Sequence, residues 1–244
     1  MTIMRGFLCF VCFLTSGLLP LAAQTAPGGG TRQKPARSAW FACISMPEGL
    51  ENPVTVMCGK SISKLELSLY MTSDPVRIPD DGVVRIVRAV PDPANQGKTK
   101  YLILAEARIP DNVRDALIIL VPLPKPKGDL LFESKVQDLA EFKGGDRLFI
   151  NMSDTDIGVK IGDSRIGVPA RKTNIYRAKD LSKPTDMQIV YTFYHPGEKQ
   201  WKLLSASTIV LRPTRRKICI FNNGSRIGNI KKHDILFPVP LNKS

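Results

Sequence analysis

The residue types that most often carry out chemistry in proteins are few in this chain. It has two histidines, His195 and His233, and neither lies in a His-Glu-x-x-His pattern, which would place two zinc ligands on one face of a helix. His195 precedes a proline in an expected hairpin turn and His233 follows two lysines, so we expect both as exposed turn residues. The sequence therefore predicts no catalytic residue, no metal site and no cofactor.

Two short stretches approach known motifs and then depart from them. Gly59-Lys60-Ser61 has the ending of a phosphate-binding loop, but Val54 stands where that loop requires its first glycine. Residues 162–166 lack the closing glycine of a nucleophile elbow and are expected in a β-turn, so Ser164 is interpreted as a turn serine. Neither stretch supports a catalytic prediction.

Residues 154–158 (Asp-Thr-Asp-Ile-Gly) begin like a calcium loop. Arg165 stands where that loop needs its late carboxylate, and we interpret the segment as a solvated turn. A secreted enzyme would have to use surface carboxylates such as Asp154, Asp156 or Asp163. This enzyme of unknown class is the alternative to a non-catalytic function.

Positive charge is concentrated toward the C-terminal end. The formal net charge is +13, and residues 198–244 carry ten Lys or Arg against two acidic residues. Two clusters flank the Asn223-Gly224 turn: Arg212, Arg215, Arg216 and Lys217 precede it, and Arg226, Lys231 and Lys232 follow it. If residues 218–221 and 226–230 pair as a hairpin, the clusters approach one another at its open end and form an anion-attracting patch. The alternative is a charged, solvated edge that prevents sheet aggregation.

Anionic envelope polymers and lipid head groups are the partners that such a patch would suit. Nucleic acid is not an expected partner, because the chain is expected to be exported and has no aromatic basic motif.

The elements that must position these residues are strands. In residues 148–168 apolar residues alternate over short runs separated by polar turn residues, which predicts three strands joined by tight turns. Similar strands with Pro, Gly, Asn and Asp turns follow one another along the chain, and no long amphipathic helix competes with them. The predicted fold is all-β, an antiparallel β-sandwich with two tandem sandwich-like modules.

A repeated pattern is the reason to expect two modules. Val76-Arg77-Ile78-Pro79-Asp80 matches Val159-Lys160-Ile161-Gly162-Asp163 in residue type, and residues 101–124 are echoed by residues 187–213. The two matches keep one order, with offsets of 83 and 86 positions. Convergence is the alternative, since any two antiparallel meanders share alternation and turn residues.

Residues 1–23 have the parts of a secretory signal peptide. Arg5 is their single charge, residues 7–19 form an apolar core, and Leu21-Ala22-Ala23 offers small residues for cleavage. A transmembrane anchor is the alternative, but the apolar run is short for a bilayer and Pro20 ends it. We expect an exported protein, periplasmic or extracellular, with no transmembrane segment after cleavage.

Composition divides the rest of the chain. Residues 24–38 have little to bury and are expected as a disordered leader. We expect a first β domain at 39–124, a Pro-rich connector at 125–128, and a second β domain with the basic C-terminal hairpin at 129–244. The connector prediction rests on prolines at alternate positions, which also suit an edge strand.

Three cysteines remain after the expected cleavage. Cys43 and Cys58 are closely spaced in a chain bound for an oxidising compartment, so we expect them to form a disulfide worth roughly 3 kcal/mol. Cys219 lies in an apolar strand and is expected as a buried, reduced thiol. Residues 151–153 and 223–225 match the glycosylation acceptor pattern, which matters only in a glycosylating host.

The layout resembles uncharacterised secreted bacterial all-β proteins. The resemblance rests on the signal, the repeated strand-turn blocks and residues 210–216 leading into a final hairpin, and it brings no activity and no site residues. We therefore expect an exported, non-catalytic protein of the cell envelope or periplasm with a binding or structural role.

Overall fold

The computed structural model describes residues 36–238 except 96, 180 and 225–228. The expected signal peptide and nearly all of the expected leader lie outside these residues. The described part contains sixteen β-strands, one short 3₁₀ helix and no α-helix, which confirms the all-β prediction. It holds no helix with the length and apolar character needed to span a membrane.

The first half of the described chain forms two four-stranded sheets, which we call module 1. Their strand orders are β4-β1-β7-β8 and β3-β2-β5-β6. The strands are β1 (Ser38–Cys43), β2 (Val54–Cys58), β3 (Ser61–Leu65), β4 (Val76–Arg77), β5 (Val83–Pro91), β6 (Thr99–Arg108), β7 (Asp115–Lys127) and β8 (Leu130–Asp138).

The second half forms two more four-stranded sheets, module 2, with orders β12-β9-β15-β16 and β11-β10-β13-β14. The 3₁₀ helix η1 (Leu139–Glu141) precedes it. The strands are β9 (Arg147–Asn151), β10 (Ile157–Ile161), β11 (Ser164–Val168), β12 (Thr173–Tyr176), β13 (Thr185–His195), β14 (Gln200–Leu211), β15 (Arg215–Asn223) and β16 (Ile230–Pro238).

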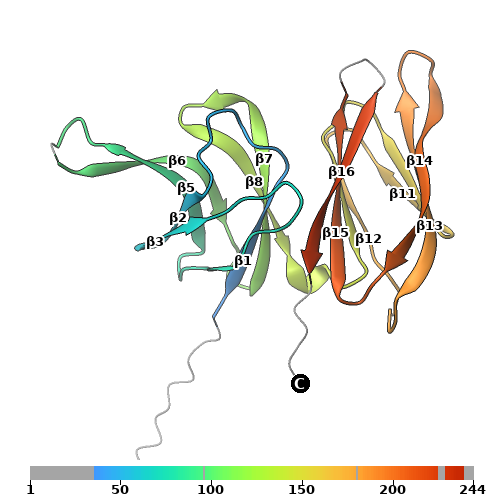
Figure 1. The fold of residues 1–244 in the computed structure, drawn as a ribbon, viewed down its shortest axis with the longest axis horizontal. Coiled ribbons are helices and arrows are strands. Elements are labelled where there is room, and N and C mark those ends of the chain that lie inside the picture. Colours follow the sequence, from blue (N-terminus) through green and yellow to red (C-terminus); the bar gives the residue numbers. More distant parts are fainter. Residues whose placement is uncertain (1–35, 96, 180, 225–228, 239–244) are drawn as a thin grey trace, which may run out of the picture. The chain divides into compact units, whose positions relative to one another are not determined.

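Module 2 repeats the topology of module 1 strand for strand (Figure 1). Adding eight to each strand number of module 1 gives both sheet orders of module 2. The one parallel pair of named strands in each module, β1–β7 and β9–β15, also occupies the same place. Because the likeness includes this uncommon parallel pairing, shared meander character alone does not account for it, and the prediction of two similar sandwich-like modules is confirmed.

The repeat has a different register from the one that the sequence pattern suggested. The hairpin β10–β11 turns at Gly162-Asp163, and its counterpart β2–β3 turns at Gly59-Lys60. Gly162 has φ 54° and Gly59 has φ 61°, as a two-residue turn with glycine in its first position requires. Residues 159–163 therefore correspond to residues 56–60, not to residues 76–80. Alternation is common to all strands, so only the turn glycine marks the register.

The Pro-rich segment lies inside a strand. Residues 122–127 complete β7, which pairs with β8 up to Lys127 opposite Leu130, with a register irregularity between Pro122 and Lys127. The prolines are accommodated in this irregular, exposed end of the hairpin, where fewer ladder donors are needed. The expected connector at 125–128 is thus a hairpin tip, and η1 with residues 142–146 links the modules.

Three apolar clusters hold the described chain together, and strand alternation distributes residues among them. On β15, Cys219 and Phe221 face the interior of module 2, while Ile218 and Ile220 belong to a cluster that also includes Ala42 and Leu117 of module 1. The strands of the parallel pairs are therefore covered on both faces. This double coverage explains the continuous apolar runs Ala-Leu-Ile-Ile-Leu-Val in β7 and Ile-Cys-Ile-Phe in β15.

Candidate functional site

The two predicted basic clusters lie at opposite ends of the β15–β16 hairpin. Arg216 is opposite Phe237 near the open end, whereas Lys232 is opposite Phe221 near the turn. Five residues separate these positions along β15, roughly 17 Å at the rise of a β-strand. Arg226 lies outside the described residues. The structure therefore does not bring the clusters together at the open end; only Lys217 of the first and Lys232 of the second approach one another, at Asp234.

Lys217 and Lys232 share one carboxylate. Lys217 Nζ lies 2.8 Å from Asp234 Oδ2, and Lys232 Nζ lies 2.9 Å from Asp234 Oδ1 and 5.0 Å from the centre of the Tyr191 ring. Burial acts to raise the pKa of Asp234, but the hydrogen bonds from both lysines outweigh it and hold the pKa below its ordinary value. Lys232 is thereby committed to the interior of the sandwich, while Lys217 keeps donors for a further partner. Lys231 is exposed.

Arg216 has a packing role on the other face of the sheet. Its guanidinium carbon lies 4.8 Å from the centre of the Phe237 ring and 5.8 Å from that of Phe142. The residue is 8 % exposed, and this burial lowers the pKa of its guanidinium. The stacked arginine covers aromatic surface in the cluster shared by the modules.

Arg147, which sequence reasoning did not single out, is the most deeply buried arginine of the described residues. It is 5 % exposed, and its Nε has no hydrogen-bond partner in the described part of the chain. The carboxylate of the neighbouring Asp146 accepts from Lys143 N at Oδ2 and from Ala178 N at Oδ1, each at 2.8 Å, and forms no ion pair with Arg147 among the described residues. A buried arginine Nε without an acceptor is unfavourable, and an oxygen of a ligand would satisfy it.

Arg147 and Lys217 stand side by side and face the same way. They are register partners on the parallel strands β9 and β15, in the same alternation as Phe149 and Cys219, which face the sandwich interior. In module 1 the first inward-facing pair of the parallel strands is Ala39 and Ala116, both fully buried. The paired cations are therefore a feature of module 2 alone among the two sandwiches.

The paired cations line a small hollow at one end of module 2. Arg212 and Arg215, both exposed, also line it, together with Val210 and Leu211 from the end of β14. The rest of the lining is Gly145, Asp146, Arg216 and Leu236, so one carboxylate stands among the cations. We call this the cationic hollow, defined by Arg147, Arg212, Arg215 and Lys217. Its volume is about 120 Å³, the space of about four water molecules and well below the ~300 Å³ of a pocket for a drug-sized ligand. It suits one carboxylate, sulfate or phosphate group.

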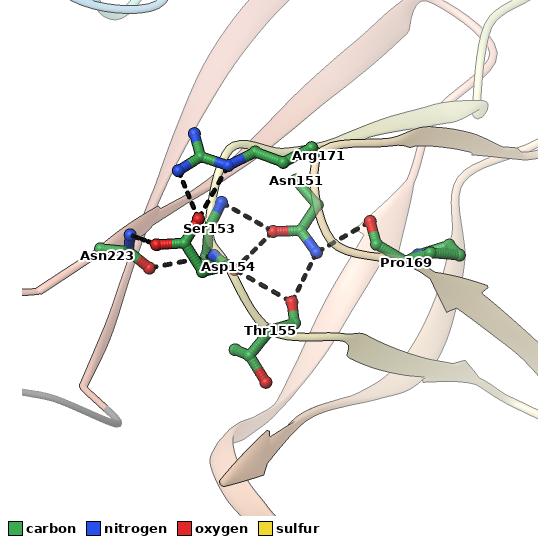
Figure 2. A network of polar contacts seen from close by, with 7 residues as sticks. All are labelled: Asn151, Ser153, Asp154, Thr155, Pro169, Arg171 and Asn223. Atoms are coloured by element: carbon green, nitrogen blue, oxygen red, sulfur yellow. Dashed lines mark hydrogen bonds and ion pairs between the residues drawn. The ribbon is translucent and has the colours of Figure 1, made fainter. Parts of the chain in front are cut away.

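The carboxylates of the enzyme alternative are not arranged for acid–base work. Figure 2 shows Asp154 held by Arg171 and Asn223: Arg171 Nε donates at 3.0 Å, and Asn223 Nδ2 donates at 2.7 Å. These hydrogen bonds, Arg171 first, lower the pKa of Asp154. Asp156 accepts from Ala170 N at 2.9 Å. Asp163 lies in the β10–β11 turn, at the other end of that hairpin.

The same loop contains one of the glycosylation acceptor patterns, and the fold makes its asparagine inaccessible. Asn151 is fully buried, and its Nδ2 donates to the carbonyl oxygens of Thr155 and Pro169 at 2.8 and 3.1 Å (Figure 2). It also donates to Val168 O at 2.9 Å. Its Oδ1 accepts from Ser153 N at 3.0 Å and from Ser153 Oγ at 2.6 Å. The side-chain amide of Asn151 therefore links the loop that follows β9 to the loop that follows β11, a role that we call the strut role of Asn151.

The cysteines of the described residues are free thiols, so the expected Cys43–Cys58 disulfide is not formed in this structure. Cys58 lines a hollow with Arg77, which is the register partner of Ser38 at the start of β1, while Cys43 ends that strand. A disulfide needs Cα atoms within about 7 Å of each other, and the structure pairs neither thiol. Burial raises the pKa of Cys43 to about 12 and that of Cys219 to about 11.

The histidines differ from the expectation of exposed turn residues. Both are half-buried, and His233 lies within β16, where burial lowers its pKa. His195 Nδ1 accepts from Glu198 N at 3.1 Å and caps the β13–β14 turn. No cluster of His, Cys, Asp or Glu with the makings of a metal site occurs in the part of the chain that the structure describes.

No protein-family model matches this chain, and no curated protein matches it. A functional proposal for this protein therefore rests on its fold and on the cationic hollow.

Proposed function

We propose that this chain is an exported, non-catalytic β-sandwich protein of the cell envelope or periplasm whose second module binds anionic groups in the cationic hollow. The observation that carries the proposal is the inward-facing pair of Arg147 and Lys217, in which the buried Nε of Arg147 has no hydrogen-bond partner in the described residues. Export rests on the signal-like residues 1–23 alone.

The charge balance around the hollow favours an anion. Arg147, Lys217 and Lys232 face the sandwich interior, and Asp234 is the one carboxylate that forms an ion pair with any of them among the described residues. Like charges directly opposite on neighbouring strands repel one another. A bound anion accepts charge-assisted hydrogen bonds from both Arg147 and Lys217 and so offsets their repulsion. Such hydrogen bonds are stronger than those between neutral groups.

The donors define the kind of anion. A guanidinium presents a planar fork that matches a carboxylate or one face of a phosphate, and a lysine ammonium donates in three directions. Arg212 and Arg215 stand exposed on the rim, where they add long-range attraction that salt screens over roughly 10 Å at 0.1 M. A single anionic group that projects from an envelope polymer or a lipid head group fits the hollow, and a flat face of a polymer does not.

The test is a calorimetric or NMR titration of the chain with inorganic sulfate and phosphate at low ionic strength. We expect the double substitution Arg147→Met and Lys217→Met to weaken binding at least tenfold, while the methionines keep the apolar stems. A matched control exists in Lys160 and Arg165, an exposed Lys–Arg register pair on β10 and β11. The same double substitution there should leave binding unchanged.

Two results would overturn the proposal. One is a parent chain that binds neither anion at low salt. The other is a hollow variant that binds as tightly as the parent and the control.

A further inference from the structure

The two modules differ at one edge of the sandwich. In module 1 the edge strands β6 and β8, one from each sheet, pack beside one another. Their counterparts in module 2 are β14 and β16, and no comparable packing joins them among the described residues. The outer backbone edge of β14 is therefore left without a neighbouring strand in the described part of the chain.

The open edge has two of the devices that keep an edge strand from pairing, Lys202 and a register irregularity opposite Tyr191 and Thr192, and both lie in its first half. β14 is 12 residues long, and residues 203–211 contain no charge and no proline. The charged residue of the strand, Lys202, pairs with Glu198. Trp201 and Leu203 are 54 % and 65 % exposed. An exposed, long, apolar edge is the feature that strand addition exploits in peptide recognition.

β14 runs into the cationic hollow. Its last residues, Val210 and Leu211, line the hollow with Arg147 and Lys217. A polypeptide that lies along β14 in the parallel sense therefore brings its C-terminal end to these cations. The hollow has a volume of about 120 Å³, which is room for a carboxylate group.

We propose that module 2 binds the C-terminal segment of another polypeptide as an added strand, parallel to β14, with its terminal carboxylate in the cationic hollow. Main-chain hydrogen bonds to β14 hold the segment, and its apolar side chains pack against Leu203 and Trp201. The carboxylate part rests on the proposed anion-binding function, whereas the strand part rests on the open edge.

A second copy of this chain is a less suitable occupant. Two copies of β14 would pair antiparallel, which leaves the hollow of each copy without an anion from the added strand. The C-terminal end of another polypeptide can pair with the open edge of β14 and also place its carboxylate in the cationic hollow.

The probe is an N-acetylated seven-residue peptide of alternating valine and threonine, tested with a free C-terminal carboxylate and with a C-terminal amide. We expect the acid to bind at least tenfold more tightly than the amide, and sulfate to compete with it. Replacing Arg147 and Lys217 with methionine should abolish the difference between acid and amide.

Edge variants separate strand addition from anion binding. The N–H groups of alternate residues in an edge strand point away from the sheet. Of the two variants Ala206→Pro and Ser207→Pro, one therefore removes an outward N–H group and leaves the hydrogen bonds between β14 and β13 intact. The variant of the two that keeps the parental melting temperature should lose the peptide and retain sulfate.

The outcomes are distinct. Sulfate binding with no peptide binding, or peptide binding that the tolerated proline leaves intact, overturns the inference and leaves the proposed function standing. Equal binding of acid and amide overturns the carboxylate assignment. Binding of neither probe overturns both proposals. A concentration-dependent dimer in sedimentation that the tolerated proline abolishes overturns the inference in favour of a second copy.

Discussion

Arg147 and Lys217 lie side by side on the parallel strands β9 and β15, at the register position where module 1 has Ala39 and Ala116. One copy of the repeated sandwich thus packs its strand ends with the smallest apolar side chains, and the other places two cations there. The substitution of two alanines by two cations turns a packing position into a candidate binding position within one topology.

The anion site should appear in thermal stability. A ligand that binds the folded state raises its stability in proportion to the logarithm of ligand concentration above Kd. We expect sulfate to raise the melting temperature of the parent at constant ionic strength and to leave the Arg147→Met, Lys217→Met variant unaffected. Without sulfate, that variant loses the Lys217–Asp234 ion pair together with the repulsion between the two cations, so it should lose no more than the roughly 1.5–3 kcal/mol of one charge-assisted hydrogen bond. A large loss of stability would assign the pair a structural role instead.

Asp234 should make stability depend on pH in the acid range. Its pKa is lowered in the folded state, so its contribution is fully present above the unfolded value near 3.8 and is lost as pH falls through the folded value. Asp234→Asn should cost about 1.5–3 kcal/mol at neutral pH, since two charge-assisted hydrogen bonds weaken. The difference between parent and variant should shrink below about pH 4. Thermal unfolding from pH 2 to 7 measures it, with the exposed Asp186→Asn as control, for which we expect no such convergence.

Asn151 should be one of the most sensitive polar positions in module 2. Asn151→Ala orphans buried carbonyl oxygens of two loops, and each orphaned group costs about 1–3 kcal/mol. Asn174, which is exposed and donates to Gly167 O at 2.9 Å, is the matched control and should lose less than about 1 kcal/mol on change to alanine. Urea unfolding compares them. Equal losses would contradict the strut role of Asn151.

The thiols should react in a defined order. Cys58 is half-buried, and burial and then Asp81 raise its pKa, so it should react with a thiol reagent slowly at neutral pH and faster as pH rises. Cys43 and Cys219 are buried and should react only after unfolding. Peptide mass spectrometry without reductant checks both points. A Cys43–Cys58 bridge in the isolated protein would contradict the free thiols of the structure, in which Cys43 ends β1 and Cys58 ends β2.

Local patterns predicted the fold class because alternation and turn chemistry act over a few residues. The Gly162-Asp163 turn illustrates this, since a two-residue hairpin with glycine at positive φ is readable from the sequence and occurs again at Gly59-Lys60. The Pro-rich stretch shows the limit of local reading. The same residues suit a linker or an irregular strand end, and pairing with β8 decides between them.

The sequence by itself determined the all-β class, many of the strands and the basic C-terminal end, because these follow from composition and short-range periodicity. It suggested two similar modules, but the register of the repeat came only from the structure. The tertiary structure alone decided which charges meet. Arg147 becomes a buried neighbour of Lys217 only because β9 pairs in parallel with a strand some 70 positions later. The register of β15 with β16 in turn separates Arg216 from Lys232. Long-range pairing is a collective result of core packing, and no local pattern encodes which distant cation will lie opposite another.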